Sequence, residues 1–196
     1  MNKHNQGFTL TPNFGVGSAR AERGFTLIEL LVVISVIGLL ASMILVSLNS
    51  ARVKARDTRR LADIKQFQTA LELYYDKNDR YPISGGATSP NSNWSNSGDG
   101  SWITLQTALN PYLSKLSIDP KQSPSGTWPG SAGEHGYAFY SRTDSGCVQG
   151  QWYMIVYQLE NAKGPDPGLT ACDGEFYQYG GIGSDTNIKT IGVRVK

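Results

Sequence analysis

Hydrophobic residues are concentrated in one uninterrupted run near the start of the chain. Between Phe25 and Leu48 the sequence contains a single charged residue, Glu29, among largely aliphatic side chains. As a helix with a rise of about 1.5 Å per residue, this run would be roughly 36 Å long, which is enough to cross a bilayer. The apolar region of a secretory signal peptide is shorter, about 7–15 residues. The run therefore predicts a membrane-spanning helix over residues 25–48.

The pattern becomes amphipathic after residue 48. A basic cluster opposed only by Asp57 comes first: Arg52, Lys54, Arg56, Arg59 and Arg60. We expect this cluster to form a face exposed to solvent or to lipid headgroups. Apolar residues then recur at helical spacing, at Leu61, Ile64, Phe67, Leu71 and Tyr74. The stripe predicts that the helix continues through the segment 49–82 and packs against a core.

The end of this helix is marked by a proline. No proline occurs between Phe25 and Tyr81, and Pro82 disfavours helical geometry at Tyr81. We therefore expect one long helix that ends at about Lys77.

Residues 83–196 have the pattern of a small mixed domain. The segment 84–101 is rich in Gly, Ser and Asn, which predicts a surface loop, and a short helix is expected within 102–116. Strand patterns rich in aromatic and β-branched residues occupy 137–142, 151–160 and 188–195, and the first two are separated by a turn sequence. We predict an α+β fold, in which an antiparallel sheet of three or four strands packs on the long helix.

Charge and cysteine content narrow the function classes. The net charge is +2 and lies entirely in the first 24 residues, because 15 basic and 15 acidic residues follow from Phe25 onward. A neutral body argues against a general nucleic-acid-binding protein. The two cysteines, Cys147 and Cys172, are too few for a zinc site with four cysteines. If the domain is exported, we expect them to form a disulfide rather than two free thiols.

Glu29 is the residue of the apolar run that most needs an explanation. A carboxylate at the centre of a membrane span costs about 2.5–3.5 kcal/mol on insertion scales. One interpretation is an interfacial residue, one turn inside the span. In the other interpretation, Glu29 pairs with a cation from another chain. Cleavage before Phe25 would create an α-amino group, and a neighbouring copy could offer that group to Glu29. We favour the second interpretation because of the surrounding motif.

That motif is Gly24-Phe25-Thr26-Leu27-Ile28-Glu29, preceded by Arg23 and followed by the apolar run. It closely resembles the class III signal of type IV prepilins and type II secretion pseudopilins. The resemblance implies a leader peptide at residues 1–24, cleavage after Gly24 by a prepilin peptidase, and N-methylation of Phe25. It also implies that Glu29 acts in filament assembly. The sequences of residues 70–82 and 111–120 are similar to those of major pseudopilins, and Val46 stands where many members have proline.

The resemblance implies a pilin fold and a structural function. The protein is expected to insert as a single-pass precursor in the cytoplasmic membrane. It would then assemble, through an inner-membrane assembly platform, with other pilins into an extracellular or periplasmic filament. The disulfide and the long loops favour a type IV pilus slightly, whereas the two similar segments favour a pseudopilus of type II secretion. A rival from another class is an enzyme or binding module with an uncleaved anchor.

No catalytic constellation is visible in the sequence, so we do not expect an enzyme. His4 lies in the leader and His135 in a loop sequence, and no Gly-x-Ser-x-Gly motif occurs. No cofactor or metal is expected. Calcium remains an alternative, because some pseudopilins bind it in a C-terminal loop and oxygen ligands occur at Asp173, Glu175, Asp185 and Asn187. Their spacing does not match an EF-hand.

Overall fold

The computed structural model describes residues 24–85, 93–125, 127–129, 131, 133–143, 146–162, 164–180 and 187–195. The chain divides into two compact units, Met1–Leu45 and Val46–Lys196. Residues 1–23 of the predicted leader peptide and Asp185 lie outside the described residues.

The N-terminal unit consists of the first part of helix α1. This helix begins at Leu27 and ends at Asn78, close to the predicted end at Lys77. Every described residue of the unit is exposed, and the helix is long and apolar enough to cross a membrane. The helix passes Val46 without a break.

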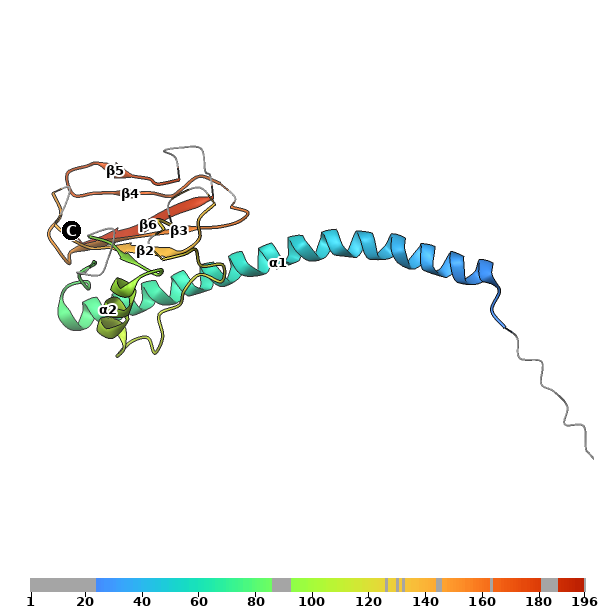
Figure 1. Ribbon diagram of the computed structural model, residues 1–196. Coiled ribbons are helices and arrows are strands. Elements are labelled where there is room, and N and C mark those ends of the chain that lie inside the picture. The colour runs from blue at the N-terminus through green and yellow to red at the C-terminus, as the bar shows by residue number, and fades with distance from the viewer. Residues whose placement is uncertain are drawn as a thin grey trace, which may run out of the picture. The chain divides into compact units, whose positions relative to one another are not determined.

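The C-terminal unit contains a four-stranded antiparallel sheet packed on the second half of α1 (Figure 1). The strands are β1 (Ser95–Asn96), β2 (Tyr137–Tyr140), β3 (Trp152–Gln158) and β6 (Ile188–Arg194), in the order β1-β2-β3-β6. In the register Phe139 pairs with Ile155, and Ile155 pairs with Ile191. The α+β pilin fold and its small antiparallel sheet are therefore confirmed.

The two faces of the sheet bury different elements. Tyr153 and Ile155 of β3 share a core with Ile64, Phe67 and Leu71 of α1. The alternate residues of β3, including Trp152 and Met154, pack with Cys147 and the strands β4 (Leu169–Thr170) and β5 (Phe176–Tyr177). This two-stranded ribbon lies on the side of the sheet away from α1 (Figure 1). Neighbouring residues of a strand face opposite sides, which explains why β3 is buried throughout.

The end of α1 is closed by a left-handed residue and a buried tyrosine. Asp79 has φ of 53°, and its N–H donates to the Tyr75 carbonyl at 2.8 Å, as in an αL helix cap. Tyr81 is fully buried and its ring packs against those of Tyr75 and Tyr153. The Tyr-Pro step therefore anchors the chain as it leaves the helix.

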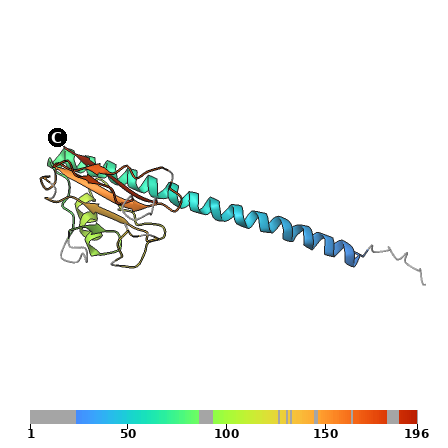
Figure 2. The same ribbon diagram turned by 90° about the horizontal axis from the view of Figure 1, so that it is seen from above.

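Two details of the sequence interpretation are wrong. The segment 84–101 is not only a surface loop, because it includes the buried strand β1 and the first residues of helix α2 (Gly100–Leu109). This helix packs beside α1 (Figure 2) and is the short helix expected within 102–116, although it begins two residues earlier. Asp99 caps it, with its side chain accepting from the Ser101 N–H at 2.8 Å.

The second error lies where the basic cluster meets the apolar stripe, at Arg60 and Leu61. Leu61 was assigned to the core stripe but is 48% exposed, because it lines an open groove beyond β3. Arg60 was assigned to a solvated face but is fully buried, because acidic groups from distant segments converge on it.

Candidate functional site

The predicted cleavage junction is open. Phe25 is 86% exposed and precedes the first residue of α1. A Cβ added at Gly24 would meet no atom within 4 Å, so the fold itself does not require glycine there. A requirement for glycine at this position would therefore come from whatever enzyme binds the junction.

Glu29 caps its own helix. The Thr26 N–H and hydroxyl donate to Glu29 Oε2 at 2.8 and 2.7 Å, and the Glu29 N–H donates back to Thr26 Oγ1 at 3.2 Å. This reciprocal pattern is a capping box, and the sequence Thr-x-x-Glu ahead of an apolar run is the signal that could have predicted it. Both bonds use the same carboxylate oxygen, so Oε1 accepts no hydrogen bond from the described residues.

The helix after Glu29 offers an apolar surface to its surroundings. Its polar side chains are satisfied locally: the Ser35 and Ser42 hydroxyls donate to the Leu31 and Leu39 carbonyls, each at 2.7 Å. Contiguous apolar surface of this extent marks contact with a membrane or with other proteins. The unit is therefore suited to contact with lipid or with other apolar helices.

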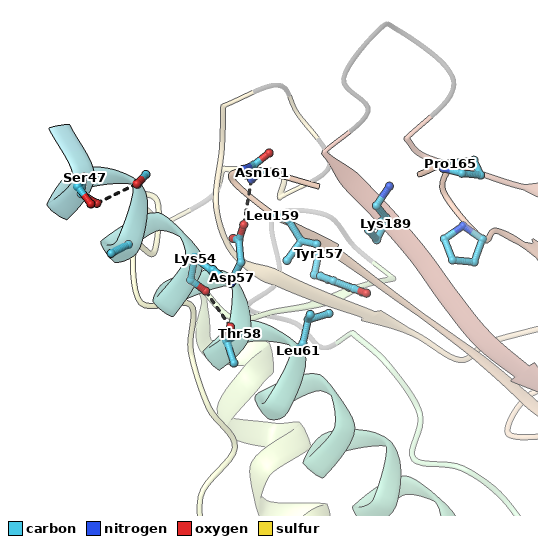
Figure 3. A pocket seen from close by; sticks show the side chains of 13 residues that line it. Ser47, Lys54, Asp57, Thr58, Leu61, Tyr157, Leu159, Asn161, Pro165 and Lys189 are labelled. Carbon is cyan, nitrogen blue, oxygen red and sulfur yellow. Dashed lines mark hydrogen bonds between the residues drawn. The ribbon is translucent and has the colours of Figure 1, made fainter. Parts of the chain in front are cut away.

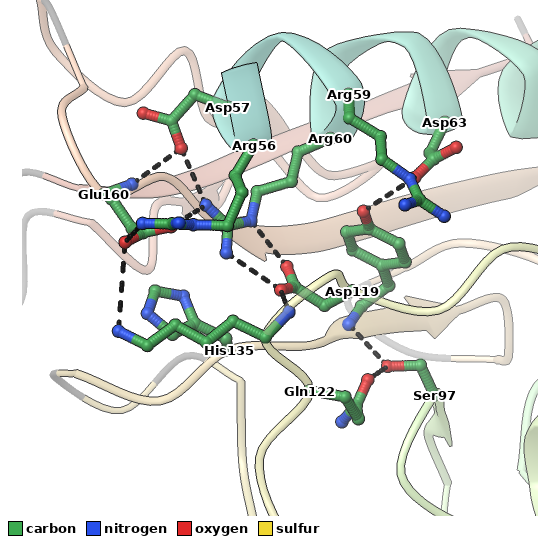
Figure 4. A network of polar contacts seen from close by, with 12 residues as sticks. Arg56, Asp57, Arg59, Arg60, Asp63, Ser97, Asp119, Gln122, His135 and Glu160 are labelled. Carbon is green, nitrogen blue, oxygen red and sulfur yellow. Dashed lines mark hydrogen bonds and ion pairs between the residues drawn. The ribbon is translucent and has the colours of Figure 1, made fainter. Parts of the chain in front are cut away.

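A buried polar network joins the second half of α1 to the sheet unit (Figure 4). Arg60 donates to both carboxylate oxygens of Asp119, at 2.7 and 2.9 Å, to Asp57 at 2.7 Å and to Glu160 at 2.8 Å. Asp57 in turn accepts the backbone N–H groups of Glu160 and Asn161, each at 2.9 Å. The network fixes the chain immediately after β3 to the helix.

Arg56 completes the network from the preceding turn of α1. It donates to both oxygens of Glu160, at 2.6 and 2.7 Å, the bidentate geometry that arginine and carboxylate favour. These bonds, helped by Arg60 and opposed by burial, lower the pKa of Glu160 to about 2. For Arg60, burial alone would lower the guanidinium pKa, but the bonds to Asp119 and Glu160 more than offset it and raise that pKa. Arg60 and Glu160 are therefore both charged at neutral pH.

His135 lies in a loop, as predicted, but it is buried beside this network (Figure 4). Its Nδ1 has no hydrogen-bond partner among the described residues. Burial, followed by the charge of Arg60, lowers the His135 pKa, so the ring is neutral at pH 7.

The predicted disulfide is present in the structure. Cys147 and Cys172 are joined, with their Cα atoms 4.9 Å apart. The bridge ties the turn before β3 to the chain between β4 and β5. It belongs to the architecture of the C-terminal unit.

Two of the oxygen ligands considered for calcium accept backbone hydrogen bonds. Asp173 accepts the Glu175 N–H at 2.9 Å, and the Asn187 side chain accepts the Ala162 N–H at 3.1 Å. No group of three or more His, Cys, Asp or Glu side chains placed to hold a metal occurs among the described residues. Calcium binding stays an alternative to the expected absence of a metal.

Sequence reasoning did not find the network because its members are far apart in the chain. Arg60 and Asp119 are 59 residues apart, and Arg60 and Glu160 are 100 residues apart. Only the pair of Asp57 and Arg60, three residues apart on one helix, left a local signal.

Comparisons with known proteins agree with these features. The family described as "Prokaryotic N-terminal methylation motif" matches residues 19–45. The type II secretion system core protein G of Pectobacterium carotovorum is 40% identical over 65 residues, covering 33% of this chain and 42% of that protein. The same-named protein of Aeromonas hydrophila is 40% identical over 65 residues, covering 33% and 46%.

A longer match extends past the helix. The type II secretion system core protein G of Pseudomonas aeruginosa is 31% identical over 116 residues, covering 54% of this chain and 72% of that protein. The chain spans less than half the length of the first relatives named above. No solved structure matches.

Proposed function

Since the chain belongs to the family of type II secretion system core protein G, we propose that it is a structural subunit of a pseudopilus, the periplasmic filament of a type II secretion system. The match of 116 residues to the Pseudomonas aeruginosa protein carries this proposal. It also corrects the slight preference for a surface pilus, which rested on the disulfide and on loop composition. Neither feature distinguishes the two kinds of filament as directly as similarity along the helix and into the domain.

The geometry of the N-terminal unit supports the proposed maturation. The protein enters the membrane as a single-pass precursor, and a prepilin peptidase cuts after Gly24 and methylates Phe25. The exposed junction supports access by such an enzyme. The apolar first half of α1 then leaves the lipid and packs among the helices of other copies, while the C-terminal unit forms the filament surface.

The test is mass spectrometry of the N-terminus of protein taken from membranes of cells with an active prepilin peptidase. We expect a chain that begins with methylated Phe25, and mostly uncleaved protein would contradict the proposal. Gly24→Leu should abolish processing. Gly38→Leu is a matched control, because a Cβ at Gly38 also meets no atom within 4 Å but the residue is far from the junction.

A type IV pilus is the second candidate, favoured by the disulfide. The genes next to this one distinguish the two: a retraction ATPase indicates a pilus, and a secretin within a secretion operon indicates a pseudopilus. Deleting the gene in its host should then abolish secretion of a type II substrate while leaving surface filaments intact.

A further inference from the structure

A groove in the C-terminal unit follows the membrane span directly in the sequence (Figure 3). It has a volume of about 860 Å³ and is bounded on one side by residues of α1 between Ser47 and Leu61. The opposite wall comes from the end of β3 and the chain after it, and from β6: Tyr157, Leu159, Asn161, Pro165, Pro167 and Lys189. The apolar run ends at Leu48, so the first wall residues lie within one helical turn of its end.

The walls of the groove combine positive charge with apolar surface. Lys54 of α1 lines one side and Lys189 of β6 lines the other. Asp57 is the acidic residue of the wall, but its carboxylate is already bound by Arg60 and by two backbone N–H groups. Leu61 and Leu159 supply apolar surface between these polar groups.

Lys54 is the cation best placed to receive a ligand. Its side chain is exposed and forms no ion pair with any described residue. The neighbouring arginines differ from Lys54, because Arg56 forms an ion pair with Glu160 and Arg60 forms one with Asp119. Lys189 is held in the opposite wall by a bond from its ammonium to the Gly164 carbonyl at 2.8 Å, so it contributes a fixed positive charge.

We propose that this groove binds the phosphate headgroup of an anionic phospholipid while the precursor resides in the membrane. Ser47, Ser50 and Ala51 of its wall lie at the end of the apolar run, where a membrane-spanning helix meets the headgroups. The ammonium of Lys54 would pair with the phosphate, and Ala51, which is nearer to the apolar run, would contact the glycerol carbons. Lipid binding would be a property separate from filament assembly. It rests on the proposed function, because it requires that the precursor is inserted in a membrane.

The experiment uses the full chain in nanodiscs that contain equal amounts of phosphatidylglycerol and phosphatidylcholine. Native mass spectrometry measures how much phosphatidylglycerol stays bound relative to phosphatidylcholine. Lys54→Gln should lower this preference about fivefold, since one basic residue near a membrane surface contributes about 1 kcal/mol. Arg52→Gln is the matched control, because Arg52 is exposed on the same helix but does not line the groove. It should retain the preference.

A second variant tests the cavity rather than the charge. Ala51 lines the groove and is exposed, so Ala51→Trp should fill the space without changing the charge or the core. We expect it to lower lipid retention as Lys54→Gln does, with unchanged thermal unfolding in both variants. Retention as in the parent would overturn the proposal.

Three other outcomes would also overturn it. Equal losses for Lys54→Gln and Arg52→Gln would show general surface attraction rather than a site. Displacement of the lipid by millimolar inorganic phosphate would show a site for the free ion. Unchanged lipid retention with weaker cross-linking between copies through the groove would show a subunit interface. Processing at Gly24 is measured in the same samples. If it is normal, any of these outcomes counts against lipid binding in the groove and not against the proposed function.

Discussion

The two halves of α1 differ in where their side chains find partners. In residues 27–45 every side chain is exposed, and those of Ser35 and Ser42 bond only to their own helix. In residues 46–78 one face is buried against the sheet, and Arg60 is bound on several sides by carboxylates. Covering exposed apolar surface with lipid or with another chain lowers the free energy of the system. The first half is therefore built for association, and the second half for folding.

This difference predicts how substitutions should divide along one helix. Changes in the second half should lower the free energy of unfolding of the C-terminal unit. Changes in the first half should leave that quantity unchanged and act on assembly. We expect the effect on the free energy of unfolding, measured on the full chain in detergent, to decrease from Arg60 through the disulfide and Glu160 to Glu29.

The largest loss is expected from Arg60→Met. Removing a buried cation leaves Asp57, Asp119 and Glu160 without their shared partner, and breaking a buried ion pair in this way typically costs about 3–5 kcal/mol. Chemical denaturation followed by tryptophan fluorescence measures the change. Arg59→Met is the matched control: its side chain is 66% exposed and lies 3.9 Å from Asp63, so at most about 1 kcal/mol is expected. Equal losses of stability in the two variants would contradict the conclusion that Arg60 is the buried centre of the network.

The disulfide should come next. Replacing both Cys147 and Cys172 by serine frees a loop of 25 residues in the unfolded chain, which corresponds to a loss of about 3 kcal/mol in the chain-entropy model. Denaturation of the double variant, compared with the parent that keeps its disulfide, measures it. Alkylation of both cysteines in the native, unreduced protein would show that the bridge does not form in the cell.

A smaller, pH-dependent loss is expected from Glu160. Its pKa is lowered from 4.5 to about 2 in the folded protein, so its contribution is complete above the unfolded pKa and is lost as pH falls toward 2. Thermal unfolding measured between pH 5 and pH 2 should show this loss, and Glu160→Gln should flatten that part of the profile. A profile of unchanged steepness in the variant would assign the acid sensitivity to other carboxylates.

Local patterns predicted the elements whose signals are contiguous in the chain. The apolar run, the stripe at Ile64, Phe67 and Leu71, and the strand patterns of β2, β3 and β6 each lie within one segment. They were placed to within a few residues, because period and composition determine them locally. Strands β1, β4 and β5 are two residues long and carry no periodic signal.

The polar site was harder to predict because burial depends on tertiary contacts. Arg60 is one of five basic residues in a short stretch, and nothing local separates it from the exposed Arg59. What separates them is the position of Asp119 and Glu160 in the folded chain. The capping role of Glu29 has a local signal, because Thr26 stands three residues before it in the chain.

The smallest effect on unfolding is expected at Glu29, together with a large effect on assembly. In the isolated chain Oε2 caps the helix and Oε1 has no donor among the described residues. The α-amino group of Phe25 in a neighbouring copy could supply that donor after cleavage. Glu29→Val should still insert in the membrane, since the span becomes more apolar, and the C-terminal unit should unfold as in the parent. Filament yield should fall several-fold because neighbours lose the charge pair that sets their register.

Two further variants separate the charge of Glu29 from its capping bonds. Glu29→Gln keeps an oxygen that can accept from Thr26 but carries no charge, so it should assemble as poorly as Glu29→Val if pairing with the amine matters. Thr26→Val removes the hydroxyl from the capping box and keeps the carboxylate, so it should assemble nearly as well as the parent. Filaments sheared from cells and quantified by immunoblot give the yields. If Glu29→Gln assembled normally while Thr26→Val did not, Glu29 would act through its helix cap, and the pairing between subunits would be wrong.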